Sequence, residues 1–243
     1  MDVVQKLYFW QYIDLTAFDA IGLLWFFILW LGYQRYAYIQ GRARPSLMSV
    51  MAQYRRDWWA NMVARELRVI DTGILTNLSN SATFFASTTL FILGGLLALL
   101  GTTDKIVALV QGLPFHARVA GQPWELKILL LVGIFVYAFF KFTWALRQFG
   151  FSSVLVGAAP KVTEPGHEDT HFIKRAARLS TLAAESFNYG LRAYYFGLAA
   201  LSWFVSTSLF IVVTTWVVLV LYIREFRSPA LRALTVDKID EPH

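Results

Sequence analysis

The sequence contains no cysteine and little charge. Without cysteine, the chain has no disulfides, no cysteine-ligated zinc, no iron–sulfur cluster and no thiol catalysis. Charged residues make up 16% of its 243 residues, whereas about a quarter is usual in soluble domains. The Lys and Arg residues that give the formal charge of +6 lie mostly between apolar runs. This placement therefore indicates the positive-inside bias of membrane proteins, and we expect no nucleic-acid partner.

Common catalytic and nucleotide-binding motifs are also missing. The sequence has no P-loop, no dinucleotide fingerprint, no G-x-S-x-G and no paired carboxylates within an apolar run. The segment from Met1 to Asp19 lacks a basic region and a small-residue cleavage site, so we expect no cleaved signal peptide. These absences favour a non-enzymatic protein without a cofactor.

What the sequence does have is four long apolar runs in a chain of 57% apolar content. A bilayer core of about 30 Å is crossed by about 20 helical residues. We therefore predict an all-α fold, a polytopic membrane helix bundle with four transmembrane spans and helices prolonged into the cytoplasm. It forms a single domain over residues 1–243, with the lipid bilayer as a partner. The expected spans are about 20–38, 80–100, 128–147 and 198–223, with cytoplasmic helical parts at about 47–77 and 172–192.

Two of the predicted helices are expected to continue beyond the membrane because nothing in the sequence interrupts them. No proline interrupts the segment from Arg55 to Leu100, whose first half has helical apolar periodicity, so one long helix is expected to enter the membrane. The 31 uncharged residues from Ala193 to Ile223 exceed the bilayer thickness. For this segment we expect a helix that projects into the cytoplasm, with a modest bend near Ser206.

Basic residues predict the orientation of a multi-pass inner-membrane protein. The two loops on one side hold 13 Lys and Arg, and the termini and middle loop together hold eight. The richer side should be cytoplasmic, which leaves both termini periplasmic. At the head of the first span, Asp19 is expected to be a helix N-cap at the interface.

Three long strings resemble a known family. They are FFASTTLFILGGLLALLG, KILLLVGIFVYAFFKFTWALRQFGFSSVLVGAAP and ESFNYGLRAYYFGLAALSWF. They are similar to a bacterial inner-membrane family known as domain of unknown function 599, over roughly Leu23 to Ser228. The resemblance implies a helical integral membrane protein with no established activity, so it transfers no site residues.

A polar stripe on the second span is the first candidate site. At 100° per residue its members share one arc of the helix. Such an arc can line a solvated pathway, with phenylalanine rings as a constriction. Close helix packing is the plainer alternative, because small and hydroxyl residues favour it. The stripe comprises Asn77, Asn80, Ser81, Thr83, Phe84, Ser87, Thr88 and Phe91, with Gly94 and Gly95.

Lys141 is the second candidate, because it is charged and falls within the third span. An ammonium there must pair, face water or snorkel. Asp71 and Glu185 are expected on the same side of the membrane, so either can pair with Lys141. The alternative is that Lys141 only joins helices within the bundle.

The segment His167-Glu168-Asp169-Thr170-His171 matches H-E-x-x-H, the pattern in which two histidines bind zinc and the glutamate is a general base. It follows Pro165-Gly166 in a polar linker and lacks an evident third ligand. We expect no metal here, and a zinc-dependent membrane hydrolase is a remote alternative.

Two classes of function remain. One is an oligomeric channel or transporter for a small ion or solute, which uses the stripe and Lys141. The other is a non-catalytic membrane scaffold or accessory subunit, in which the stripe packs against a copy of the chain or another membrane protein.

Overall fold

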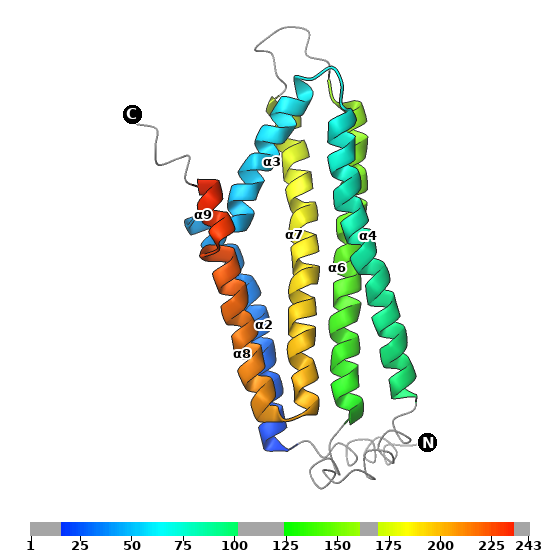
Figure 1. Cartoon of the computed structure of the whole chain (residues 1–243), viewed down its shortest axis with the longest axis vertical. Helices are drawn as coiled ribbons and strands as arrows, with labels where there is room; N and C mark the ends of the chain where they lie inside the picture. Colours follow the sequence, from blue (N-terminus) through cyan, green and yellow to red (C-terminus); the bar gives the residue numbers. More distant parts are fainter. Residues whose placement is uncertain (1–15, 102–123, 161–169, 236–243) are drawn as a thin grey trace.

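The computed structural model describes residues 16–101, 124–160 and 170–235, which form helices joined by short turns (Figure 1). The described part contains no strand, and this confirms the predicted all-α helix bundle. In chain order the elements are α2 (Ala17–Ala43), α3 (Leu47–Val63), α4 (Val69–Leu100), α6 (Trp124–Ala158), α7 (Thr170–Leu201), the 3₁₀ turn η2 (Ser202–Phe204), α8 (Thr207–Phe226) and α9 (Pro229–Thr235).

Four helical segments of the described chain are long and apolar enough to cross a membrane. They are Ala17–Gly41, Val69–Leu100, Trp124–Ala158 and Thr207–Thr235. Large apolar side chains cover their outer faces: Phe91 is 81% exposed, Phe140 65% and Trp216 63%. Exposed side chains of this kind suit contact with lipid rather than water.

Helix α7 is a fifth long helix, and it runs between α6 and α8 (Figure 1). It packs closely on α6, because a Cβ added to Gly190 would lie 2.5 Å from the ring of Phe142. After Leu201 the chain reverses through η2, and Ser206 caps α8 by accepting from the N–H of Leu209 at 3.2 Å. The expected fourth span is present from Thr207, but its expected start at 198 and the modest bend are wrong, because the chain folds back before Thr207.

The expected continuous helix at 47–77 is also wrong. Helix α3 ends at Val63 and α4 begins at Val69, so that α3 leans away from α4 and lies against α7 (Figure 1). The turn between them is fixed by tertiary contacts. The guanidinium of Arg68 donates to the carbonyls of Val156 and Ala159, at 3.1 and 3.0 Å, at the end of α6. No proline is needed to end α3, because these contacts offset the helical bonds that are lost.

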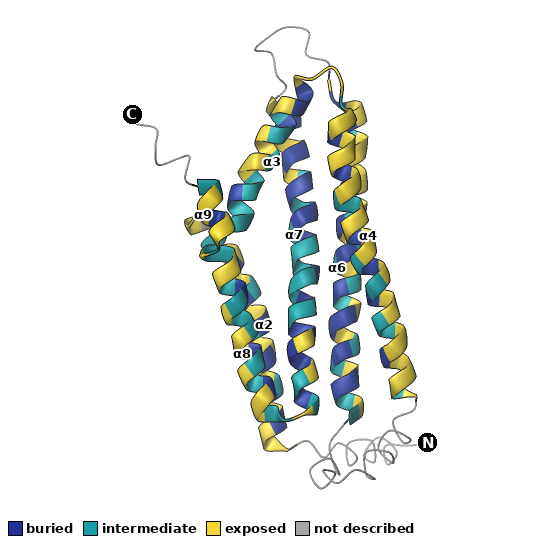
Figure 2. Cartoon of the chain, viewed as in Figure 1, coloured by how far each residue is buried: buried dark blue, intermediate teal, exposed yellow. Residues whose placement is uncertain are grey.

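The helices bury unequal shares of their surfaces (Figure 2). Helices α6 and α7 lie in the middle of the bundle and are buried along most of their length. Helix α4 lies at one edge, packs mainly on α6, and buries positions at steps of three, four and seven. Helices α2 and α8 pair at the other edge. This spacing of buried residues is typical of near-parallel helix packing.

Side chains from four elements meet at one end of the bundle and fix the direction of each helix. Asp19 accepts from the indole N–H of Trp203 at 3.0 Å and from the hydroxyl of Thr207. The ammonium of Lys127 donates to the carbonyl of Trp203 at 2.9 Å. Helices α2, α6 and α8 therefore begin at this end, and α4 and α7 end there.

This direction conflicts with the expectation of both termini on one side. The first turn of α2 and the last turn of α8 lie at opposite ends of the bundle, because α7 makes an additional pass (Figure 1). The expected cap is corrected as well. Thr16 is the N-cap of α2 and accepts from the N–H of Asp19 at 3.2 Å, while one carboxylate oxygen of Asp19 accepts from the Thr16 hydroxyl at 2.6 Å and the other turns into the bundle.

Candidate functional site

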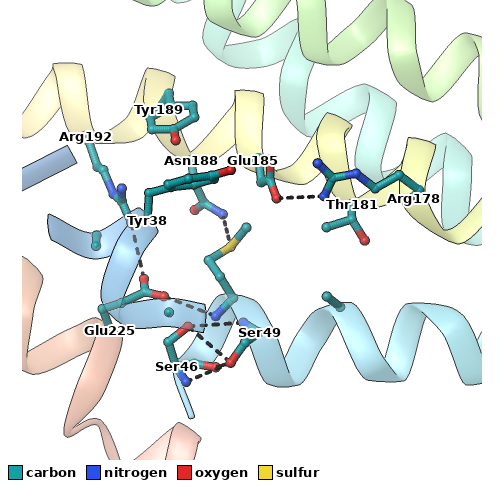
Figure 3. A pocket seen from close by; sticks show the side chains of 14 residues that line it. Tyr38, Ser46, Ser49, Arg178, Thr181, Glu185, Asn188, Tyr189, Arg192 and Glu225 are labelled. Carbon is teal, nitrogen blue, oxygen red and sulfur yellow. Dashed lines mark hydrogen bonds and ion pairs between the residues drawn. The ribbon is translucent and has the colours of Figure 1, made fainter. Parts of the chain in front are cut away.

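A polar cavity of about 200 Å³ lies between α2, α3, α7 and α8 (Figure 3). One wall is a single face of α7, because five of its lining residues follow one another at steps of three and four. The opposite wall comes from the end of α2, the start of α3 and the end of α8. The five α7 residues at these steps are Arg178, Thr181, Glu185, Asn188 and Arg192, and Tyr189 of α7 also lines the cavity.

Two ion pairs mark the rim and the inner end of this cavity. Arg178 lies 3.6 Å from Glu185, and their side chains are 60% and 29% exposed. Arg192 on α7 lies 3.4 Å from Glu225 on α8, and these side chains are 11% and 13% exposed. Charge is therefore accessible to solvent at the rim and largely withdrawn from it at the inner end.

The opposite wall is held by hydrogen bonds that depend on the start of α3. Ser46 and Ser49 form a capping box, in which each side chain accepts from the other residue's backbone N–H. Glu225 accepts from the N–H of Met48 at 3.2 Å, near the same helix N-terminus. The ring of Tyr38 lies along α7 between Arg192 and Glu185 (Figure 3). Glu225 thus joins α8 to both α3 and α7.

Two further cations, Lys141 and Arg55, do not line the cavity but lie next to residues that do. The ammonium of Lys141 lies 5.2 Å from the ring centre of Tyr189, and Arg192 lies 5.7 Å from the same centre. Arg55 on α3 is partly buried, and its Nη1 has no hydrogen-bond partner within the described part of the chain. Burial lowers the pKa of the Arg55 guanidinium, while the charge of Glu185 raises it. Arginine nevertheless stays protonated.

In the structure, Lys141, Asp71 and Glu185 make contacts other than the expected ion pair between Lys141 and one of the two carboxylates. Lys141 stacks over the rings of Tyr137 and Tyr189. Asp71 is fully buried and accepts from Trp58 at 2.7 Å and from Arg65 at 3.2 Å. Among the described residues, neither Asp71 nor Glu185 pairs with Lys141. Each carboxylate has its own arginine close by, and this explains the difference.

The polar stripe of the second span faces away from the bundle. Asn77, Asn80, Ser81, Thr83 and Ser87 are exposed, and so are Phe84 and Phe91. Thr88 is half-buried and donates back to the carbonyl of Phe84 at 2.8 Å. A Cβ added to Gly94 or Gly95 would meet nothing within 4 Å. Within the part of the protomer that the structure describes, therefore, the stripe neither packs against another helix nor lines an internal pathway.

The H-E-x-x-H segment lies outside the described residues from His167 to Asp169. Thr170 and His171 are described, at the exposed start of α7. Across the ranges that the structure covers, no group of three metal-ligating side chains occurs. The expectation that this motif binds no metal stays a prediction.

The fold by itself indicates the class of protein. Four long apolar helical segments with lipid-suited outer faces make this a multi-pass helical membrane protein. The chain belongs to the family described as Protein of unknown function, DUF599, whose model matches residues 21–230. Comparison with curated proteins and with solved structures finds no match. The family resemblance drawn from the sequence is confirmed, and it supplies no activity.

Of the residues that line the cavity, the sequence indicated only Glu185 as a candidate, together with Lys141, which lies outside the lining. The signal was present, because α7 is rich in alanine and its polar residues recur every three or four positions on one face. Charged residues before an apolar run were assigned instead to a cytoplasmic helix at 172–192. The contributions of Tyr38 and Glu225 had no local signal, because they come from helices far away in the sequence.

Proposed function

We propose that this membrane protein transports a small polar solute, which binds in the cavity between α2, α3, α7 and α8. The observation that carries the proposal is the set of charged side chains from α7 and α8 around a cavity at the ends of the apolar helices α2 and α8. Charge within a membrane bundle is costly and is typical of substrate or ion pathways. A volume of about 200 Å³ suits a small organic or inorganic solute.

The proposed orientation has α3 and α9 in the cytoplasm of a bacterial inner membrane. Four of the 22 Lys and Arg fall in three stretches of the sequence. Lys6 precedes α2, Lys105 and Arg118 fall between α4 and α6, and Lys127 lies near the start of α6. The other Lys and Arg lie mostly toward the end of the bundle that carries α3 and α9, and this favours a cytoplasmic location for that end. The N-terminus is then periplasmic and the C-terminus cytoplasmic. Reporter fusions at Pro160 and after His243 should both report the cytoplasm, and opposite reports would contradict the five-pass arrangement.

The contacts at the far end support a transporter rather than an open channel. Asp19, Lys127, Trp203 and Thr207 join the starts of α2, α6 and α8 to η2 through mostly buried hydrogen bonds. In the proposed orientation they close the periplasmic end, while Arg178 keeps the cytoplasmic rim accessible. The structure is then an inward-facing state, and transport requires these contacts to separate.

Flux through the reconstituted full-length chain tests the proposal. Liposomes with the protein are loaded in turn with radiolabelled glycerol, choline, alanine and inorganic phosphate, and protein-free liposomes are the control. We expect saturable flux for one class, and its loss in Arg192→Gln. If the folded protein moves none of the four faster than protein-free liposomes do, the transporter proposal is wrong.

A scaffold is the second candidate, favoured by the outward direction of the α4 stripe. Asparagine amides facing hydrocarbon leave polar groups unsatisfied, at a cost of several kcal/mol. A second copy of this chain, or another membrane protein, would cover them. Because the chain has no cysteine, Ser87→Cys reports on a two-fold contact directly. It should form a disulfide-linked dimer in membranes, whereas Phe140→Cys on the exposed face of α6 should not.

A further inference from the structure

The charges around the cavity are not balanced. Two carboxylates, Glu185 and Glu225, each face one arginine, Arg178 and Arg192. Arg55 and Lys141 do not line the cavity, but each lies next to a residue that does, Arg55 near Glu185 and Lys141 over the ring of Tyr189, and neither forms an ion pair within the described chain. The cavity surroundings therefore carry four cations against two anions, and the excess lies on the side of Glu185 and Tyr189.

The two additional cations are held in ways that leave hydrogen-bonding capacity unused. Lys141 contacts the faces of Tyr137 and Tyr189, which satisfy its charge but accept few of its three N–H groups. Nη1 of Arg55 is buried and has no hydrogen-bond partner among the residues that the structure describes. An unpaired buried donor is costly, and more so when it is charged. Both observations favour a negatively charged acceptor beside this part of α7.

We infer that the cavity binds an anionic group, a carboxylate or a phosphate, from a free solute or a lipid headgroup. Arginine matches both groups because its N–H donors can bond two oxygens at once. The cavity ends close to the last turns of α2 and α8, so headgroups and cytoplasmic solutes both have access to it. The inference rests on the proposed function for the solute that is moved, although binding can be measured without flux.

Thermal unfolding of the full-length protein in neutral detergent tests the inference. The probes are inorganic phosphate and acetate for a free anion, and phosphatidic acid in the micelle for a headgroup. Choline chloride and sodium chloride at equal ionic strength are the controls. We expect the unfolding midpoint to rise with a free anion or with phosphatidic acid, because a ligand that binds the folded state stabilises it. Whichever anion stabilises the protein identifies the source. If none does, or if choline does so instead, the inference is wrong.

A pair of adjacent arginines supplies the matched variants. Arg55 is partly buried and lies close enough to the cavity residue Glu185 for the two charges to interact, while Arg56 is exposed. Arg55→Gln should weaken anion binding by about tenfold or more, as expected from loss of a charged hydrogen bond. Arg56→Gln removes the same charge and should bind as the unaltered protein does. Equal weakening in both would mean that only overall charge matters, and this overturns the inference. If Arg55→Gln does not fold, anion binding is measured with Arg55→Lys instead, which keeps the charge.

Failure of transport and failure of the anion site give different results. A protein that is stabilised by phosphate but moves no solute in liposomes refutes the transporter and retains the anion site. A protein that moves choline or glycerol, and is not stabilised by anions, retains the transporter and refutes the anion site.

Discussion

Helices α4 and α7 each carry a polar stripe, and the two stripes face in opposite directions. The stripe on α4 faces out of the bundle, and its hydroxyls bond back to their own helix, as that of Ser81 does to the carbonyl of Asn77 at 3.0 Å. The stripe on α7 faces α2, α3 and α8, and its charges pair with residues of α7 and α8. Helical periodicity identifies a polar face, but the neighbours of the helix decide whether it binds a solute, meets a partner or meets lipid.

The position of each helix in the bundle explains the difference. Helix α4 is at the edge and has α6 as its main neighbour, so the greater part of its surface is outside. Helix α7 has neighbours on several sides, and its alanine and glycine residues allow close approach of α6. A central helix can carry charge because adjacent helices supply counter-charges and hydrogen bonds.

Loss of the inner ion pair should have the largest effect. Glu225→Ala leaves Arg192 mostly buried without its counter-charge, and should lower the free energy of unfolding by roughly 3–5 kcal/mol. Asn80→Ala on the outward stripe is the control and should stay within about 0.5 kcal/mol in the monomer. Denaturant titration in micelles measures both. Equal effects would mean that the two stripes do not differ in the way described.

Glycines on the two helices should respond in opposite directions. In Gly190→Ala the new Cβ meets the Phe142 ring at 2.5 Å, so overpacking should cost roughly 1–3 kcal/mol. In Gly95→Ala nothing lies within 4 Å, and the gain in helix propensity should stabilise the monomer by about 0.5–1 kcal/mol. The same titration compares them. A destabilised Gly95→Ala monomer would place a neighbour where the structure has none.

Ser87→Leu should have the smallest effect on folding. Ser87 is exposed, so a larger side chain creates no clash within the protomer. The free energy of unfolding of the monomer should therefore stay within about 0.5 kcal/mol of that of the unaltered protein. Its effect should appear in assembly, measured by native mass spectrometry or by cross-linking. Destabilisation of the monomer by more than 1 kcal/mol would mean that the stripe packs inside the bundle, as the simpler of the two sequence interpretations held.

Thiol labelling at the same positions sharpens the comparison further. The pathway interpretation of the α4 stripe predicts that Thr83→Cys and Ser87→Cys react with a water-soluble thiol reagent. Because Thr83 and Ser87 face outward from the protomer, we expect both to be protected by lipid or a partner. The positive control is Arg178→Cys at the cavity rim, where the native side chain is 60% exposed and a thiol should react. Reaction at positions 83 and 87 would restore a water-filled route along α4, formed between protomers.

The sequence by itself determined the class of fold and the approximate membrane segments. Long apolar runs such as Ala82 to Leu100 require helices, because unpaired backbone groups are too costly in lipid. It also marked position 206 as a place where the last long apolar run is interrupted. These features depend on composition and on distances of a few residues, which can be deduced from the chain alone.

Only the tertiary structure decided how far the chain bends and which polar residues meet. The turn at Arg68 depends on carbonyls about 90 residues away, and the reversal at Ser206 turns an expected extension of the last span into a separate pass. The cavity likewise joins Glu225 to Arg192 and to Met48, on three different helices. The physical reason is that a helical pattern gives the direction of a side chain around its own axis, while burial and pairing depend on which helix lies opposite.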